Sequence, residues 1–169
     1  MEDRRSEVST GWKKKLLFAG VFVQENRLHA ILDRNLKEMT AKQWLLLVVA
    51  DAFDAPPDLT QLARVLGCSR QNIKKLAASL EKAGYVTLRG GAGDGRSLCV
   101  EITDRGKVVI GNSRDLEDKV HGALFRDFSG DEIDEYFRLS GKMMNGFGYL
   151  EALFREVLRD EGADAGEKE

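Results

Sequence analysis

Cysteine and histidine are scarce in this 169-residue chain, which contains two of each. Cys68 and Cys99 lack the paired spacing of a zinc site, and two cysteines cannot form a disulfide framework. His29 and His121 stand alone, and the sequence has neither a Gly-x-Ser-x-Gly motif nor a phosphate-binding loop. We therefore predict a protein that is not an enzyme and that has no cofactor or metal. Both cysteines are interpreted as small packing residues in a reducing cytoplasm, with redox sensing by either one as the alternative.

A long apolar run is also missing. The apolar segment Leu16–Val23 follows three lysines and thereby imitates the start of a signal peptide. It has no small-residue cleavage site, and it is far shorter than the ~20 residues that span a membrane. The segment is therefore predicted to belong to a helix of the fold, without a membrane partner.

Proline occurs only twice, as the pair Pro56-Pro57, which disfavours a helix in the residue before it. Directly afterwards, the run Leu59–Val86 has the pattern of two short amphipathic helices joined by a tight turn. Gly67 is predicted to end the first helix, Ser69 to cap the second and Gly84 to close it. The predicted inward faces consist of Leu59, Leu62, Ala63, Val65 and Leu66, and of Ile73, Leu76, Ala77, Leu80 and Ala83.

The opposite face of the second helix carries hydrogen-bonding and mostly cationic side chains. They are Arg70, Gln71, Asn72, Lys74, Lys75 and Ser79. Such groups read base edges or hold phosphates when a helix lies in the major groove of DNA. Gln71 and Asn72 can pair with adenine and Arg70 with guanine, whereas Lys74 and Lys75 are assigned to phosphates. Asn72 has a helix cap as its alternative role, and Ser69 is expected both to cap the helix and to touch a phosphate.

Two segments with alternating polarity follow these helices. Tyr85–Arg89 and Leu98–Ile102 flank the glycine-rich stretch Gly90–Arg96, which predicts a β-hairpin with a loop of sequence GGAGDGR. A hairpin directly after a helix-turn-helix is the wing of a winged helix. Arg96, as a residue of the wing tip, is expected to enter the minor groove, and a solvated loop arginine is the alternative. Arg89 is expected to supply a second phosphate contact.

The charges are unevenly distributed, although the net charge of the chain is only −2. Residues 60–107 contain nine basic and four acidic side chains, whereas residues 108–169 contain eight basic and fifteen acidic ones. Residues 1–59 are balanced. The excess of positive charge therefore coincides with the segment that is predicted to meet phosphates.

Three stretches of the chain, LTQLARVLGCSRQNI, LEKAGYV and DGRSLCVEITDRG, resemble the MarR family of winged-helix transcription regulators. In that family an Asp-x-Arg pair in the wing precedes a strand that ends in Leu/Ile-Thr and a short polar segment with glycine. The positions are filled here by Asp94, Arg96, Ile102, Thr103 and Gly106. Asp94 is then expected to orient Arg96 through a charge-assisted hydrogen bond.

Apolar periodicity predicts further helices on both sides of the winged helix. On the N-terminal side, Ser9 or Thr10 can cap a helix over residues 12–36, and Thr40–Gln43 is a capping box for the next. On the C-terminal side, Thr103 can cap a helix, and Ser129–Glu132 can start a last one that extends to residue 159. Three glycines in that last helix, at positions 141, 146 and 148, are interpreted as a kink or a close helix crossing.

We therefore predict a mainly α, α+β winged-helix fold in which residues 1–169 form a single MarR-like domain. Residues 40–106 are the predicted winged helix-turn-helix DNA-binding part, residues 9–37 and 107–160 the helical dimerisation part, and residues 161–169 a disordered acidic tail. The apolar surface of the terminal helices exceeds what one small winged helix can cover, which favours a homodimer with interleaved chain ends. The resemblance implies the same arrangement.

These features predict a sequence-specific regulator of transcription that binds double-stranded DNA as a homodimer on a pseudo-palindromic operator. The resemblance implies a repressor that is relieved by oxidation or by a small aromatic or anionic effector. Candidate residues for an effector crevice are Trp12, Arg27, His29 and Trp44, and a structural role is the alternative for His29. The rival interpretation of the whole chain is a winged-helix protein-interaction module without specific DNA binding.

Overall fold

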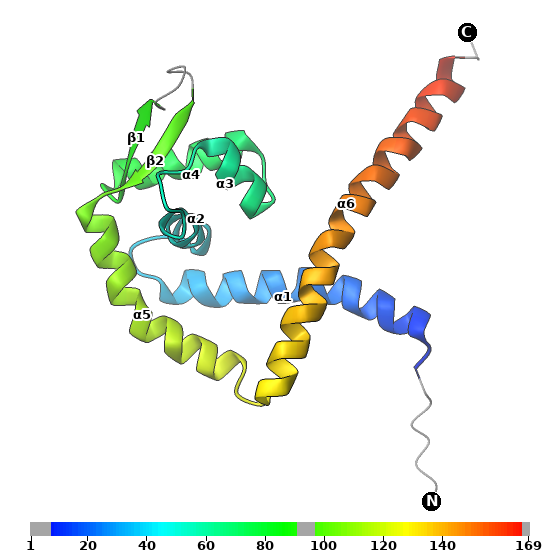
Figure 1. Ribbon diagram of the computed structural model, residues 1–169, viewed down its shortest axis with the longest axis horizontal. Coiled ribbons are helices and arrows are strands. Elements are labelled where there is room, and N and C mark those ends of the chain that lie inside the picture. Colours follow the sequence, from blue (N-terminus) through cyan, green and yellow to red (C-terminus); the bar gives the residue numbers. More distant parts are fainter. Residues whose placement is uncertain (1–7, 91–96, 167–169) are drawn as a thin grey trace, which may run out of the picture. The chain divides into compact units, whose positions relative to one another are not determined.

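The computed structural model describes residues 8–90 and 97–166, with the backbone alone for residue 115 and residues 159–166. Its elements are α1 (Thr10–Asn35), α2 (Ala41–Asp51), α3 (Leu59–Leu66), α4 (Arg70–Lys82), β1 (Val86–Gly90), β2 (Leu98–Ile102), α5 (Asp104–Leu124) and α6 (Gly130–Gly166) (Figure 1). The chain divides into two compact units, Met1–Arg114 and Asp115–Glu169. A mainly helical winged-helix fold, as predicted, is confirmed.

The core of the first unit lies between α2, α3, α4 and the β-hairpin, which Figure 1 shows grouped together. Its fully buried side chains include Leu46, Leu47, Leu59, Leu62, Ile73, Leu80, Val86 and Val100. One predicted core residue is wrong: Val65 of α3 is 55% exposed. At 100° per residue, position 65 lies roughly 110° round the helix from the stripe formed by residues 59, 62, 63 and 66. This core holds the winged helix together.

The helix starts are fixed by side-chain caps. The predicted caps of α1, α2 and α6 are confirmed, since Ser9, Thr40 and Ser129 accept hydrogen bonds from backbone N–H groups three residues ahead. In α3, Asp58 and Gln61 form a complete capping box. Thr103 accepts a hydrogen bond of 3.1 Å from the backbone N–H of Gly106 at the start of α5. Hydrogen-bonded first turns explain why these helices begin directly after their caps, in α1 at Thr10, two residues before the predicted start.

The hairpin is antiparallel, with Val86 opposite Ile102 and Gly90 opposite Leu98. The loop before α3 runs along the other edge of β2, where the backbone N–H of Val100 donates to the carbonyl of Pro57 over 2.9 Å. A β-bridge between Asp58 and Cys99 continues this pairing. Helix α2 has already ended at Asp51, ahead of the proline pair, and the segment with the prolines leads the chain into a position beside the hairpin.

The base of the hairpin is joined to α5 by a very close backbone approach. Thr103 Oγ1 lies 2.7 Å from the carbonyl oxygen of Gly84, and the Thr103 N–H donates to the carbonyl of Tyr85. Gly106 packs directly on this joint, because an added Cβ would lie 2.3 Å from the Tyr85 oxygen and 2.7 Å from Cγ2 of Ile102. The threonine and glycine of the family-like segment thus have a steric and hydrogen-bonding role.

Helix α1 contributes no buried residue. Its apolar side chains Leu16, Leu17, Phe18 and Phe22 are all more than half exposed. In the part of the chain that the structure describes, none of the helices combines the length and the apolar character needed to cross a membrane. Within the first unit, the apolar side chains of α1 are therefore left uncovered.

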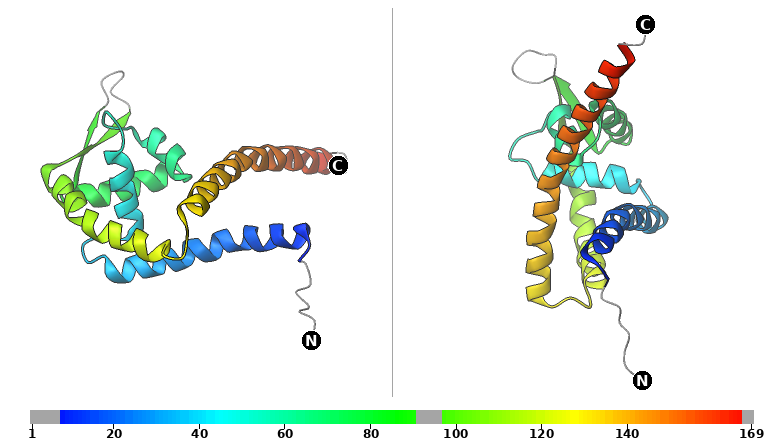
Figure 2. Two further views of the ribbon diagram at one scale, coloured as in Figure 1. Left: turned by 60° about the horizontal axis from the view of Figure 1, so that its bottom comes forward. Right: turned by 90° about the vertical axis from the view of Figure 1, so that its right-hand side faces the viewer.

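Helix α6 is continuous from Gly130 to Gly166 and gently curved (Figure 2). In the described part of the second unit, no atom lies within 4 Å of a Cβ added at Gly141, Gly146 or Gly148, so this unit makes no close helix crossing of its own there. The helical backbone extends beyond residue 160, whereas the sequence predicts a tail from residue 161. The segment EGADAG contains no proline, so its backbone can continue the helix. Residues 167–169 lie outside the described residues.

A Gly106→Ala substitution is expected to destabilise the protein by about 2–4 kcal/mol, because the new Cβ collides with backbone rather than with a movable side chain. The matched control is Gly111→Ala in the same helix, where nothing lies within 4 Å of the added Cβ. This control should stabilise by about 0.5–1 kcal/mol through helix propensity. Denaturant unfolding at one fixed protein concentration measures both, and equal effects at the two positions would contradict the steric explanation.

Candidate nucleic-acid interface

The turn between α3 and α4 has the geometry that the sequence predicts. Gly67 adopts a left-handed conformation with φ 63°, and its N–H donates to the carbonyl of Ala63. Ser69 is the N-cap of α4, and its Oγ accepts a 3.2 Å hydrogen bond from the N–H of Asn72. Ser69, and not Asn72, is therefore the capping residue, so the Asn72 side chain is available at the surface.

Helix α4 divides into a buried and an exposed face. Ile73, Ala77 and Leu80 are at most 1% exposed and anchor the helix in the core. The predicted contact residues Arg70, Gln71, Asn72, Lys74 and Lys75 are all exposed. No acidic residue occurs in the first turn. The face thus presents three cations and two amides on a helix whose other side is fixed.

Two hydrogen bonds hold the C-terminal half of α4, and neither is among the contacts expected from the sequence. The Gln43 side-chain nitrogen donates to Oγ of Ser79 over 2.8 Å, and the backbone N–H of Leu88 donates to Oε1 of Glu81 over 2.8 Å. Ser79 is exposed, as predicted, and its hydroxyl also accepts a hydrogen bond from α2. The Thr40–Gln43 capping box could have indicated Gln43 as a polar residue at this junction, but not its partner.

The hairpin brings Arg89 and Glu101 together. Nε of Arg89 lies 2.8 Å from Oε2 of Glu101, and both side chains are substantially exposed. An exposed ion pair of this kind contributes about 0–1 kcal/mol and can be exchanged for another anion. Arg89 therefore has a carboxylate partner in the free protein. Asp94 and Arg96, the predicted wing-tip residues, lie outside the described residues.

An open cavity of about 340 Å³ lies against the joint between α1 and α2. It is lined by Glu25, Asn26, His29, Asp33, Thr40, Lys42 and Leu76. His29 Nδ1 lies 2.8 Å from Oε1 of Glu25. Of the predicted effector residues, His29 lines this cavity, but Trp12, Arg27 and Trp44 do not. Two carboxylates beside one ammonium group do not favour an anion, so the structure gives no support to an anionic effector at this place.

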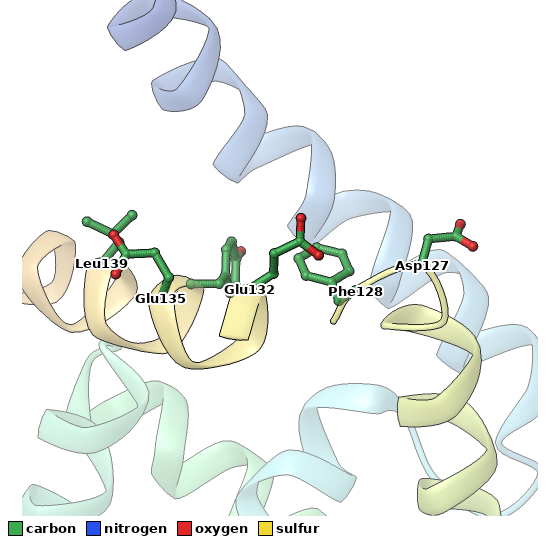
Figure 3. Close-up of a pocket in the computed structure, with 6 residues that line it drawn as sticks. Asp127, Phe128, Glu132, Glu135 and Leu139 are labelled. Carbon is green, nitrogen blue, oxygen red and sulfur yellow. The ribbon is translucent and has the colours of Figure 1, made fainter. Parts of the chain in front are cut away.

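The second unit has a shallow depression of its own, with a volume of about 290 Å³ (Figure 3). Its lining combines the rings of Phe128 and Tyr136 with the carboxylates of Asp127, Glu132 and Glu135 and the side chain of Leu139. Glu132 is bound to Ser129 in the helix cap, and Glu135 accepts two hydrogen bonds from Arg138. These bonds lower the pKa values of both glutamates, so the carboxylates are already engaged in local structure. In the described part of the chain, no group of acidic, histidine or cysteine residues is arranged to hold a metal ion.

Comparison with known proteins agrees with this geometry. Residues 37–97 match the model of the MarR family, a range that includes α2 to the hairpin loop. The resemblance on which the sequence prediction depends is thereby confirmed.

Solved structures share the fold at low sequence identity. The chain is similar to a MarR/EmrR family transcriptional regulator from Acinetobacter sp. ADP1, with 18% identity, a TM-score of 0.71, and coverage of 78% of this chain and 94% of that one. It is also similar to the transcriptional regulator BldR from Sulfolobus solfataricus, with 16% identity, a TM-score of 0.73, and coverage of 82% and 99%. A third similar structure is MepR from S. aureus in complex with DNA, with 17% identity, a TM-score of 0.70, and coverage of 77% and 97%.

A Ser69→Ala substitution is expected to cost about 1 kcal/mol of stability, because the N–H of Asn72 loses its acceptor at the start of α4. Ser69→Asn should restore most of the loss, since asparagine caps helices as well as serine does. Thermal or denaturant unfolding of the two variants measures the difference. Equal stability of Ser69→Ala and the unmodified protein would show that the cap contributes nothing.

Proposed function

We propose that this chain, whose winged-helix segment belongs to the MarR family, binds double-stranded DNA as a homodimer and thereby regulates transcription. The observation that carries the proposal is the division of α4, which buries Ile73, Ala77 and Leu80 and exposes a continuous row of cations and amides. A helix fixed on one side and polar on the other can enter the major groove without rearrangement.

The exposed side chains of α4 have the chemistry of base and phosphate contacts. Gln71 and Asn72 can each form two hydrogen bonds with adenine, and Arg70 can do so with guanine, at about 1–3 kcal/mol of discrimination for each good pair. Lys74 and Lys75 are point charges on flexible stems and suit phosphates. Ser69 completes the set at the helix N-terminus, where an anion is favoured by the backbone N–H groups.

The wing is proposed as a second contact with the duplex. Arg89 would exchange its exposed ion pair with Glu101 for a phosphate, which costs little because the pair is solvated. Arg96 would enter the minor groove, and Asp94 would orient its guanidinium group. The contribution of these two residues to the proposal comes from the sequence and the family resemblance alone.

The homodimer is proposed from apolar surface in each unit. In the first unit, the aromatic and aliphatic side chains of α1 are exposed, and in the second unit Phe137 and Tyr149 of α6 are each 80% exposed. Exposed apolar area of this extent marks an interface. Association of residues 9–37 and 107–160 with the same parts of a second chain would cover it. The two recognition helices would then read half-sites roughly 34–36 Å apart.

Repression, relief by a small aromatic or anionic effector, and a cytoplasmic location complete the proposal. They are supported by the family match of residues 37–97 and, for DNA as the partner, by the similarity to MepR, whose structure is a complex with DNA. A regulatory and non-enzymatic role also agrees with the sequence, which offers no nucleophile–base motif.

Selection of bound sequences from random duplex DNA should return a pseudo-palindrome. On that duplex, Lys74→Ala or Lys75→Ala is expected to weaken binding about equally for all sequences. The slope of log K against log salt concentration should become shallower by about 0.9 for each phosphate that the lysine no longer neutralises. Gln71→Ala should instead relax the preference at one base pair in each half-site. The charge-matched control is Lys42→Ala, which removes an exposed cation of α2 that belongs neither to the proposed contact residues nor to the proposed dimer interface.

Fluorescence anisotropy at several salt concentrations separates these effects. Duplex binding that is absent, or that does not depend on salt, would contradict the proposal and favour a winged helix used for protein interaction.

A Phe18→Glu substitution is expected to weaken self-association at least about thirtyfold, because a charge would enter an apolar interface centre. Val65→Glu is the matched control, since Val65 is a similarly exposed apolar residue on α3, outside the proposed interface. Sedimentation velocity over a dilution series measures both. A folded monomer of the unmodified chain at micromolar concentration would exclude the proposed dimer.

A further inference from the structure

The side chain of Tyr85 joins segments that are far apart in the sequence. Tyr85 is 2% exposed, and its hydroxyl donates a 2.6 Å hydrogen bond to Oε2 of Glu38, which lies in the linker between α1 and α2. The guanidinium group of Arg105 lies over the ring, 4.8 Å from its centroid. One aromatic ring therefore contacts the α1–α2 linker on one side and the start of α5 on another.

The hydroxyl of Tyr85 is held as a hydrogen-bond donor to the carboxyl group of Glu38. The bond to Glu38 raises the pKa of the Tyr85 phenol, and burial raises it further, while Arg105 lowers it. The phenol therefore keeps its proton well above neutral pH and continues to donate. A donor with a carboxylate acceptor forms a shorter and stronger bond than a neutral pair.

The backbone of Tyr85 is fixed to the end of α4. Its N–H donates to the carbonyl of Leu80, and its carbonyl accepts the N–H of Thr103 over 3.1 Å. Gly84, with φ 79°, makes the turn between the end of α4 and Tyr85, whose side chain belongs to the buried core. A displacement of the Tyr85 side chain would therefore be transmitted to the C-terminal end of α4.

The linker that receives the Tyr85 hydrogen bond is also fixed at both ends. Oδ1 of Asp33 in α1 accepts a 2.6 Å hydrogen bond from the N–H of Ala41, the first residue of α2. Gln43 accepts from the N–H of Thr40 and donates to Ser79 of α4. The Glu38–Tyr85 bond thus closes a ring of contacts from α1 through the linker to α4.

We propose that Tyr85 and Glu38 are positioning residues that fix the orientation of α4 relative to α1. The inference rests on the proposed function, because α1 is among the helices expected to join the two subunits. A dimeric reader needs both recognition helices at a set separation, and a half-site displaced by one base pair is rotated by about 36°. Loss of the bond would make the separation of the two recognition helices less well defined, although no residue of the proposed DNA-facing surface is changed.

The test compares Tyr85→Phe and Glu38→Ala, which remove the bond, with Glu38→Gln, which keeps an acceptor. Asp54→Asn is the control for loss of an exposed carboxylate in the α2–α3 loop. Each protein is titrated with the selected operator and with operators in which the half-sites are one base pair closer or farther apart. In the first two variants, the preference for the correct spacing should fall about fivefold, which is the effect of losing one hydrogen bond. Glu38→Gln and Asp54→Asn should stay within about twofold of the unmodified protein.

A second measurement does not depend on DNA. Spin labels are attached to Gln24→Cys in α1 and Ala78→Cys in α4, both exposed positions, after Cys68→Ser and Cys99→Ser, and the labelled chain is diluted with unlabelled chain. Double electron–electron resonance should give a broader distribution of the distance between the two labels for Tyr85→Phe and Glu38→Ala than for the unmodified protein, Glu38→Gln and Asp54→Asn. Thermal unfolding separates broadening from loss of fold.

The outcomes distinguish the two proposals. If the distance distributions broaden in these variants but the unmodified protein binds no duplex, the positioning role is supported and the proposed function is contradicted. A spacing preference and a distribution unchanged in Tyr85→Phe would overturn the positioning role and leave DNA binding intact. If Glu38→Gln behaved like Glu38→Ala, the hydrogen bond would not be the cause, and the inference would also be overturned.

Discussion

The burial of one face of α4 is the constraint on which the rest of the winged helix depends. Ile73, Ala77 and Leu80 are held by α2, α3 and the hairpin, so the opposite face can carry polar and charged groups without a loss of helix position. The order of the elements follows from this requirement, because α3, the turn at Gly67 and the hairpin each close one side of the same small core. The proposed function is then carried by side chains that contribute little to folding.

Local features of the fold could be predicted from the sequence, and long-range contacts could not. The caps at Ser69 and Thr103 and the left-handed turn at Gly67 depend on residues within four positions, so their chemistry is visible in the sequence. The Glu38–Tyr85 bond joins residues 47 positions apart, and the Arg89–Glu101 pair depends on the hairpin register. Val65 was misassigned because apolar character alone does not give the rotation of a short helix.

In the candidate site, too, the features of a single helix could be predicted, and its contacts with other elements could not. The exposed row on α4 follows from helical periodicity, and the residues named for it are indeed on the surface. The sequence could not show that Ser79 is bound by Gln43, or that Glu101 accompanies Arg89. Both partners change the electrostatics and the hydrogen-bonding capacity of the surface. The chemistry of a contact face can therefore be predicted from one helix, whereas its availability depends on the neighbours.

The absence of buried residues in α1 has a consequence for the order of folding. The core contacts of the winged helix all lie within one chain and can form as it emerges from the ribosome. In the proposed dimer, α1 is completed only by a second chain, so apolar surface remains open during the interval between folding and assembly. Newly made subunits would then be most vulnerable to aggregation and proteolysis when their concentration is lowest, and the abundance of the regulator would depend on its own rate of synthesis.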